Sequence, residues 1–321
     1  MRILSGIQPS GRPHLGNYFG MMQPSIQLQE QGDAFYFIAD YHALTSTHDP
    51  EALRANVREL AIDFLACGLN PEKATFWVQS HVPEVTELCW ILSCVTPMGF
   101  LERCVSYKDK IAQGIAPSHG LFAYPVLQAA DILLFDSDVV PVGKDQKQHL
   151  ELTRDVAAKF NDRYGEDLLV VPEPRIREET ATVPGLDGRK MSKSYDNAID
   201  IFEETEKKLR KKIMKIVTDT KAVEDPKDPD DSNLVRLYAL VAPPEELREM
   251  EDSFRAGGVG YGHYKQQIFE ALRDHFAPMR EKREELIADP DYVAGVLEEG
   301  AKRARTKARD VVARVREAVG M

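Results

Sequence analysis

A loop rich in glycine, proline and small polar residues occupies positions 8–17, near the start of the chain. Its two glycines allow the backbone to approach a nucleotide closely. His14 and Asn17 fall on the first turn of the helix that should follow, where backbone N–H groups and the helix dipole favour phosphate. Taken alone, the loop is equally consistent with a tight turn that carries an incidental histidine.

The pentapeptide Lys-Met-Ser-Lys-Ser at positions 190–194 is the second candidate for chemistry. Two lysines and two hydroxyls on a loop suit a polyphosphate, because they supply positive charges and short hydrogen-bond donors as pyrophosphate leaves. The alternative is a solvated linker of lysine and serine.

A third candidate is a set of polar side chains in an apolar segment: Tyr124, Gln128 and Asp131. Their i, i+4, i+7 spacing places them on one face of a helix. A polar face is costly to bury without partners. It therefore indicates either a ligand pocket or a structural cap or pair within the fold.

Short apolar segments at 2–7, 34–39, 74–79 and 138–142 are the predicted strands that position these groups. Helical segments alternate with them; one opens with Asp49 and Pro50 as cap and first-turn proline, and Asp145 could cap another that runs to about residue 160. This alternation predicts a doubly wound α/β domain with a parallel sheet. Its ligands should lie beyond the carboxyl ends of the strands.

The pattern changes after about residue 200, where helical stretches are broken by Asp/Pro, Pro-Pro and Gly-Gly segments. We therefore predict an α/β domain at 1–185, a loop at 186–200 and an all-helical domain at 201–321. The last helix, at about 291–319, could pack back on the first domain.

The whole chain of 321 residues is acidic, with 41 Lys+Arg, 52 Asp+Glu and a net charge of −11, and its composition is typical of a soluble globular protein. We find no apolar run long enough to span a membrane and no secretory leader, so we expect a cytoplasmic protein without a membrane partner. The charge disfavours non-specific coating of nucleic acid.

Positive charge is nevertheless gathered in two tracts. They comprise Lys207, Lys208, Arg210, Lys211, Lys212 and Lys215, and Lys302, Arg303, Arg305, Lys307, Arg309, Arg314 and Arg316. On helices they would form a stripe for an RNA backbone, although such runs are often only solvated faces.

Together the two loops resemble the signatures of class I aminoacyl-tRNA synthetases. The blocks at 5–11, 40–45, 124–133 and 140–149 narrow the resemblance to the tryptophanyl-tRNA synthetase family, over residues 2–320. The resemblance implies a Rossmann-like catalytic domain and a helical domain that recognises the anticodon. It implies activation of L-tryptophan with ATP, transfer to the 3′ end of tRNA(Trp), and a homodimer.

The resemblance also implies roles for individual residues. Lys190, Lys193, Ser194 and Gln8 would be catalytic. ATP would contact Gln8, Pro9, Ser10, His14, Gly16, Asn17, Gly143, Lys144, Asp145, Val183, Lys190, Met191, Ser192, Lys193 and Ser194. Tryptophan would contact Gly6, His42, Tyr124, Gln128, Asp131 and Gln146, with the indole N–H donated to Asp131.

Mg²⁺ would arrive with ATP, without dedicated protein ligands. No zinc is expected from the spacing of the four cysteines, and residues 105–321 contain no cysteine for the iron–sulfur cluster found in some members. Gln128 departs from the methionine of many members. Since tyrosine-specific relatives share a Tyr–Gln–Asp face, a tyrosyl-tRNA synthetase remains an alternative, as does a regulatory paralogue that does not charge tRNA.

Overall fold

The structure is a computed structural model, and it describes residues 1–104, 107, 111, 114, 116–142, 147–176 and 183–321. Its centre is a sheet of five parallel strands in the order β3-β2-β1-β4-β5. The strands are β1 (Arg2–Ile7), β2 (Asp33–Ile38), β3 (Ala74–Val78), β4 (Val139–Val142) and β5 (Glu173–Ile176). The predicted doubly wound α/β class is confirmed.

The sheet contains one strand that the sequence analysis did not predict. β5 reads Glu-Pro-Arg-Ile, so it has no apolar run and carries a proline. A proline is tolerated there because, among the described strands, β5 lies at the edge of the sheet with β4 as its one neighbour.

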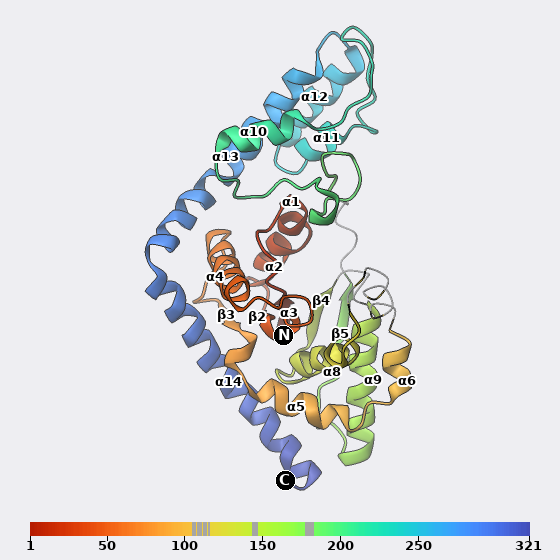
Figure 1. The fold of residues 1–321 in the computed structure, drawn as a ribbon, viewed down its shortest axis with the longest axis vertical. Helices are drawn as coiled ribbons and strands as arrows, with labels where there is room; N and C mark the ends of the chain where they lie inside the picture. Colours follow the sequence, from red (N-terminus) through yellow and green to blue (C-terminus); the bar gives the residue numbers. More distant parts are fainter. Residues whose placement is uncertain (105–106, 108–110, 112–113, 115, 143–146, 177–182) are drawn as a thin grey trace.

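Helices cover both faces of the sheet (Figure 1). In the first part of the chain they are α1 (Leu15–Asn17), η1 (Tyr18–Met22), α2 (Gln23–Leu28), α3 (Asp40–Ala43), α4 (Pro50–Ala66), η2 (Gln79–His81), α5 (Glu84–Ser93), α6 (Met98–Glu102), α8 (His119–Leu133) and α9 (Lys147–Tyr164). Asp49 caps α4 through the N–H groups of Glu51 and Ala52, and Ser118 caps α8 through Leu121 N–H.

Alternate residues of the strands feed two separate cores. Tyr36 and Ile38 pack with α1, α2 and α4 on one face, whereas Phe35 and Phe37 pack with α5, α8 and α9 on the other. The first core continues into the helical region through residues such as Phe254. The α/β domain and the helical region thus share the first of these two cores.

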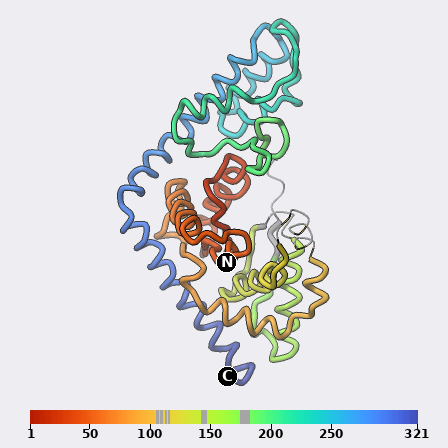
Figure 2. Tube along the Cα trace, in the orientation of Figure 1, coloured from red at the N-terminus to blue at the C-terminus, as the bar shows by residue number. Residues whose placement is uncertain are grey.

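From residue 203 onward the chain is helical. After η4 (Lys193–Tyr195) come α10 (Glu206–Met214), α11 (Asn233–Tyr238), α12 (Pro244–Ala256), α13 (Tyr261–Ala288) and α14 (Pro290–Val319). Figure 2 shows α13 leaving the helical region and α14 continuing along the side of the α/β domain to the C-terminus. Among the described residues no helix is long and apolar enough to cross a membrane.

α14 lies directly against the edge strand β3. Small residues on one face of the helix, including Gly300, Ala304 and Ala308, are buried there. A Cβ on Gly300 would lie 1.8 Å from the carbonyl oxygen of Phe76, so only glycine allows this approach.

The second basic tract lies on α14, where its cations already have polar partners; contact of this tract with RNA stays a prediction. Its cations bind groups of the α/β domain or of α14 itself. Arg305 pairs with Glu84 at 2.9 Å, and the others are Lys302 with Glu298, Arg303 with the carbonyl of Pro71, Lys307 and Arg314 with Asp136, Arg309 with Glu84, and Arg316 with Glu87. The tract fastens the last helix to the α/β domain.

Candidate active site

The first loop connects β1 to α1 at the carboxyl edge of the sheet. His14 caps α1: its Nδ1 accepts from Asn17 N–H at 3.2 Å, and its own N–H donates to Asn17 Oδ1 at 3.1 Å. Burial, with a smaller contribution from the positive charge of Lys193, lowers the pKa of His14 to about 4. The ring is therefore neutral near pH 7, and since Nδ1 accepts, Nε2 carries the proton and can donate.

The Lys-Met-Ser-Lys-Ser segment is placed beside this loop. Lys193 Nζ donates to the carbonyl oxygen of Ser10 at 3.0 Å. Met191 is buried, and its N–H donates to the carbonyl of Val183 at 3.0 Å, so these two residues anchor the loop in the core. The hydroxyls of Ser192 and Ser194 lie 2.8 Å apart and stay near the surface.

Asn197, which the sequence analysis did not single out, organises this segment. Its side chain is 2% exposed; Oδ1 accepts from Ser192 N–H at 2.8 Å, and Nδ2 donates to Asp187 Oδ1 at 2.7 Å and to the carbonyl of Lys190 at 3.2 Å. A Cβ on Gly185 would lie 2.3 Å from Nδ2. An asparagine in a polar loop gives no sequence signal, because its importance comes from burial alone.

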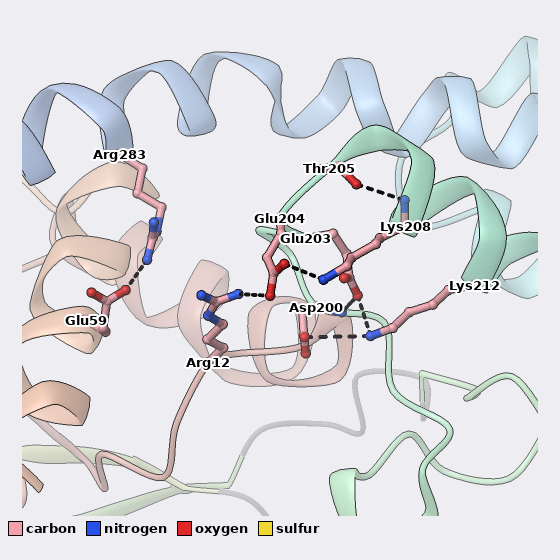
Figure 3. A network of polar contacts seen from close by, with 9 residues as sticks. All are labelled: Arg12, Glu59, Asp200, Glu203, Glu204, Thr205, Lys208, Lys212 and Arg283. Carbon is pink, nitrogen blue, oxygen red and sulfur yellow. Dashed lines mark hydrogen bonds and ion pairs between the residues drawn. The ribbon is translucent and has the colours of Figure 1, made fainter. Parts of the chain in front are cut away.

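Two backbone hydrogen bonds hold the following segment to the first loop: Leu15 N–H donates to Ile199 O at 2.9 Å, and Ile201 N–H donates to Pro13 O at 3.1 Å. Side chains add a second layer of contacts (Figure 3). Arg12 lies 3.8 Å from Glu204, and the remaining pairs are Glu204 with Lys208, Lys212 with Asp200 and Glu203, and Arg283 with Glu59. Ion pairs thus connect the helical region to both the first loop and α4.

The polar face of α8 lines the other part of the site. Asp131 is 3% exposed, and both of its oxygens have donors: His42 Nε2 lies 2.8 Å from Oδ2, and Gln79 Nε2 lies 2.7 Å from Oδ1. Tyr124 Oη lies 2.9 Å from His149 Nε2. Gln128, between them on the helix, is half-buried.

Several other residues predicted for the site lie at the end of β1 and in the loop that follows it. Gly6 is exposed at the end of β1, and a Cβ there would lie 2.3 Å from the ring of Phe37. Gln8 Nε2 donates to Ser46 Oγ at 3.2 Å. Pro9 is buried, and Gly16 packs against His14. Gly143, Lys144, Asp145 and Gln146 lie outside the described residues.

The structure therefore places the loop at 8–17 in contact with the loop at 190–194, and it places His42 in contact with Asp131. It pairs His14 with Asn17, and Tyr124 with His149. Gln79 and Asn197 are the residues that the sequence analysis missed.

A parallel sheet with a histidine-containing loop after its first strand, and a Lys-Met-Ser-Lys-Ser loop packed on that loop, defines the catalytic domain of a class I aminoacyl-tRNA synthetase. Residues 1–277 match the model of the family "tRNA synthetases class I (W and Y)". The chain belongs to this family.

Proteins that match this chain over its whole length are named for tryptophan. The chain is 54% identical to the tryptophan–tRNA ligase of Fusobacterium nucleatum, covering 100% of this chain and 98% of that protein. It is also 54% identical to that of Rhodopirellula baltica, covering both chains completely. The structure of tryptophanyl-tRNA synthetase from Campylobacter jejuni with ADP and tryptophan is 49% identical, with a TM-score of 0.95 and complete coverage of both chains.

Proposed function

We propose that this chain is an enzyme that activates L-tryptophan with ATP and transfers it to the 3′ end of tRNA(Trp), releasing AMP and diphosphate. The contact between Lys193 Nζ and Ser10 O carries the proposal, because it places the cation of one signature loop on the backbone of the other. The relatives described above match this chain over almost their full length and are named tryptophan–tRNA ligases. Their names favour tryptophan over tyrosine as the substrate.

In the first step, the tryptophan carboxylate attacks the α-phosphorus of ATP, and the bond to pyrophosphate breaks. Negative charge grows on the leaving group, and preorganised donors stabilise it. Lys190 and Lys193 supply ammonium groups, Ser192 and Ser194 supply hydroxyls, and His14 offers Nε2–H. Lys193 can exchange the Ser10 carbonyl for a phosphate oxygen, which gives its ammonium a charged partner.

Further ATP contacts complete this side of the site. The loop that would surround the phosphates includes Gln8, Pro9, Ser10, Gly16 and Asn17. The hydrogen bond between Met191 and Val183 holds the second loop against the core. Gly143, Lys144 and Asp145 would meet the ribose. Mg²⁺ would enter on the phosphates of ATP and neutralise part of their charge; among the described residues no group of three His, Cys, Asp or Glu side chains is placed to hold a metal.

Tryptophan would bind on the α8 side. An ionised carboxylate offers about four acceptor positions, so Asp131 can accept the indole N–H while His42 and Gln79 keep their contacts. Gln128 faces the same side of α8, and Gly6 leaves room at the end of β1. Tyr124, His42 and Gln146 would hold the carboxylate and ammonium of the amino acid.

In the second step, a terminal ribose hydroxyl of tRNA attacks the carbonyl of tryptophanyl-adenylate, and AMP leaves. No side-chain nucleophile is needed, because positioning and charge stabilisation supply the rate. Lys207 and Lys211 on α10, and Lys215 directly after it, are exposed and available to an RNA backbone. Lys208 and Lys212 already pair with carboxylates.

The enzyme would work as a cytoplasmic homodimer. Support for the dimer comes from α5 and the start of α6, where Trp90 is 72% exposed and Met98 is 61% exposed. Contiguous exposed apolar patches are typical of association surfaces, and we propose that these two side chains belong to one.

The test is ATP–pyrophosphate exchange with each of the twenty amino acids, followed by charging of tRNA(Trp). We expect exchange with tryptophan and aminoacylation of tRNA(Trp). Exchange driven by tyrosine instead would make the chain a tyrosyl-tRNA synthetase, and exchange or nucleotide binding without charging would make it a regulatory paralogue.

A further inference from the structure

Gln79 is a buried amide at the carboxyl end of the sheet. It is the first residue of η2, directly after β3, and is 1% exposed. Its Oε1 accepts from the backbone N–H of Tyr41 at 3.1 Å, and its Nε2 donates to Asp131 Oδ1 at 2.7 Å. The side chain therefore connects the ends of β2 and β3 to the polar face of α8.

These two contacts fix the orientation of the amide. A backbone N–H can only donate, so the atom facing Tyr41 must be the oxygen of Gln79. The NH₂ group then faces Asp131, and because it can only donate, Asp131 Oδ1 must accept. The backbone around it is also held, since Ser80 N–H donates to Asp40 Oδ1 at 3.0 Å.

The ionised carboxylate of Asp131 accepts the hydrogen bond from Gln79, and an indole N–H needs the same ionised form as its acceptor. Burial raises the pKa of Asp131, which favours the protonated acid. A proton on Oδ1 would oppose the NH₂ group of Gln79, and a proton on either oxygen removes an acceptor position from the pocket. Donors from both Gln79 and His42 counteract this tendency.

We propose that Gln79 is a positioning residue for tryptophan: its amide holds the Asp131 carboxylate in the orientation and acceptor form that receive the indole N–H. Gln79 acts through Asp131 and does not itself contact the substrate. The proposal rests on the proposed function, because it assumes that tryptophan is the amino acid bound beside α8.

The test uses Gln79→Met, which keeps the length of the side chain but removes donor and acceptor, and Gln79→Glu, which keeps the acceptor for Tyr41 and replaces the donor. Thr75→Val is the matched control, because Thr75 is a buried polar residue in β3, the strand that Gln79 directly follows. Exchange kinetics are measured with tryptophan and with its analogue in which sulfur replaces the indole N–H.

For Gln79→Met we expect the KM for tryptophan to rise about 10-fold or more, with kcat and the KM for ATP changing less than about twofold. The preference for tryptophan over the sulfur analogue should shrink by a similar factor, since only tryptophan donates to Asp131. Gln79→Glu should lose at least as much, because two carboxylates then face each other. Thr75→Val should keep the wild-type preference.

The proposal is overturned if Gln79→Met keeps the wild-type preference over the sulfur analogue. It is equally overturned if tryptophan, the analogue and ATP all weaken together, which is the result of a purely structural role. If Gln79→Met does not fold, Gln79→Glu decides by the same ratio. Tryptophan-dependent exchange by the wild type tests the proposed function separately; its absence would overturn both.

Discussion

Replacing Asn197 with alanine should slow amino-acid activation far more than it weakens the fold. The substitution removes three hydrogen bonds that hold the Lys-Met-Ser-Lys-Ser loop, one of them to the carboxylate of Asp187. At about 1 kcal/mol for each neutral bond and somewhat more for the charged one, the ordered loop loses about 3 kcal/mol relative to other loop conformations.

This energy converts into a rate if only the ordered loop stabilises the departing pyrophosphate. Each 1.4 kcal/mol corresponds to about a factor of ten, so we expect kcat/KM for ATP in the exchange assay to fall by about 10²-fold. Equilibrium binding of tryptophan should change little, because Asp131 and its donors are on another part of the site.

Two further variants separate this effect from general damage. Gly185→Ala leaves Asn197 intact but places a methyl group 2.3 Å from its Nδ2, so it should slow exchange in the same direction. Asn161→Ala is the matched control, because Asn161 also makes two side-chain bonds, to the backbone of Leu169, but lies on α9. An exchange rate for Asn197→Ala within about threefold of wild type would refute the reasoning.

Three other outcomes follow from the structure. Lys193→Ala should lower the activation rate by about 10²-fold or more while tryptophan binding is kept; near-normal ATP–pyrophosphate exchange would remove Lys193 from the proposed role. Burial raises the pKa of Asp63 to about 6, above its unfolded value of 3.8, so its protonation stabilises the fold at low pH and that contribution is lost as pH rises through 6. The unfolding free energy should therefore decline between pH 5 and 7 by about 1 kcal/mol less in Asp63→Asn than in the wild type. Urea titrations at several pH values measure this, and the same pH dependence in both proteins would contradict the assignment. Arg314→Met should cost about 2 kcal/mol of stability, because it leaves Asp136 half-buried with fewer partners. Since pairing lowers the pKa of Asp136, this loss should diminish as the pH falls. Additive effects of Arg314→Met and Asp136→Asn on the unfolding free energy would argue against the pair.

The sequence predicted the features that depend on local pattern. Four strands lie within a residue of their expected bounds because buried parallel strands are short apolar runs between turn signals. The assignment of both loops to one ATP site followed from the resemblance that their motifs carry. β5 was missed because its pairing to β4, and not its composition, makes it a strand.

Other features depend on contacts between distant residues. Gln79 and Asn197 are ordinary polar residues in sequence, and their roles arise from burial beside groups far along the chain. The cations of α14 were predicted as an RNA stripe because sequence shows charge but not the facing carboxylates, such as Glu84 and Asp136.

The position of α14 has a consequence for synthesis of the protein on the ribosome. β3 is an edge strand, and α14, the helix that covers its backbone, follows it in sequence only after α10 to α13. Until α14 emerges, a nascent chain with its sheet already formed presents an uncovered strand edge, the kind of surface that pairs with other chains. Premature termination before Pro290 would leave that edge open permanently, in a chain that still carries both signature loops.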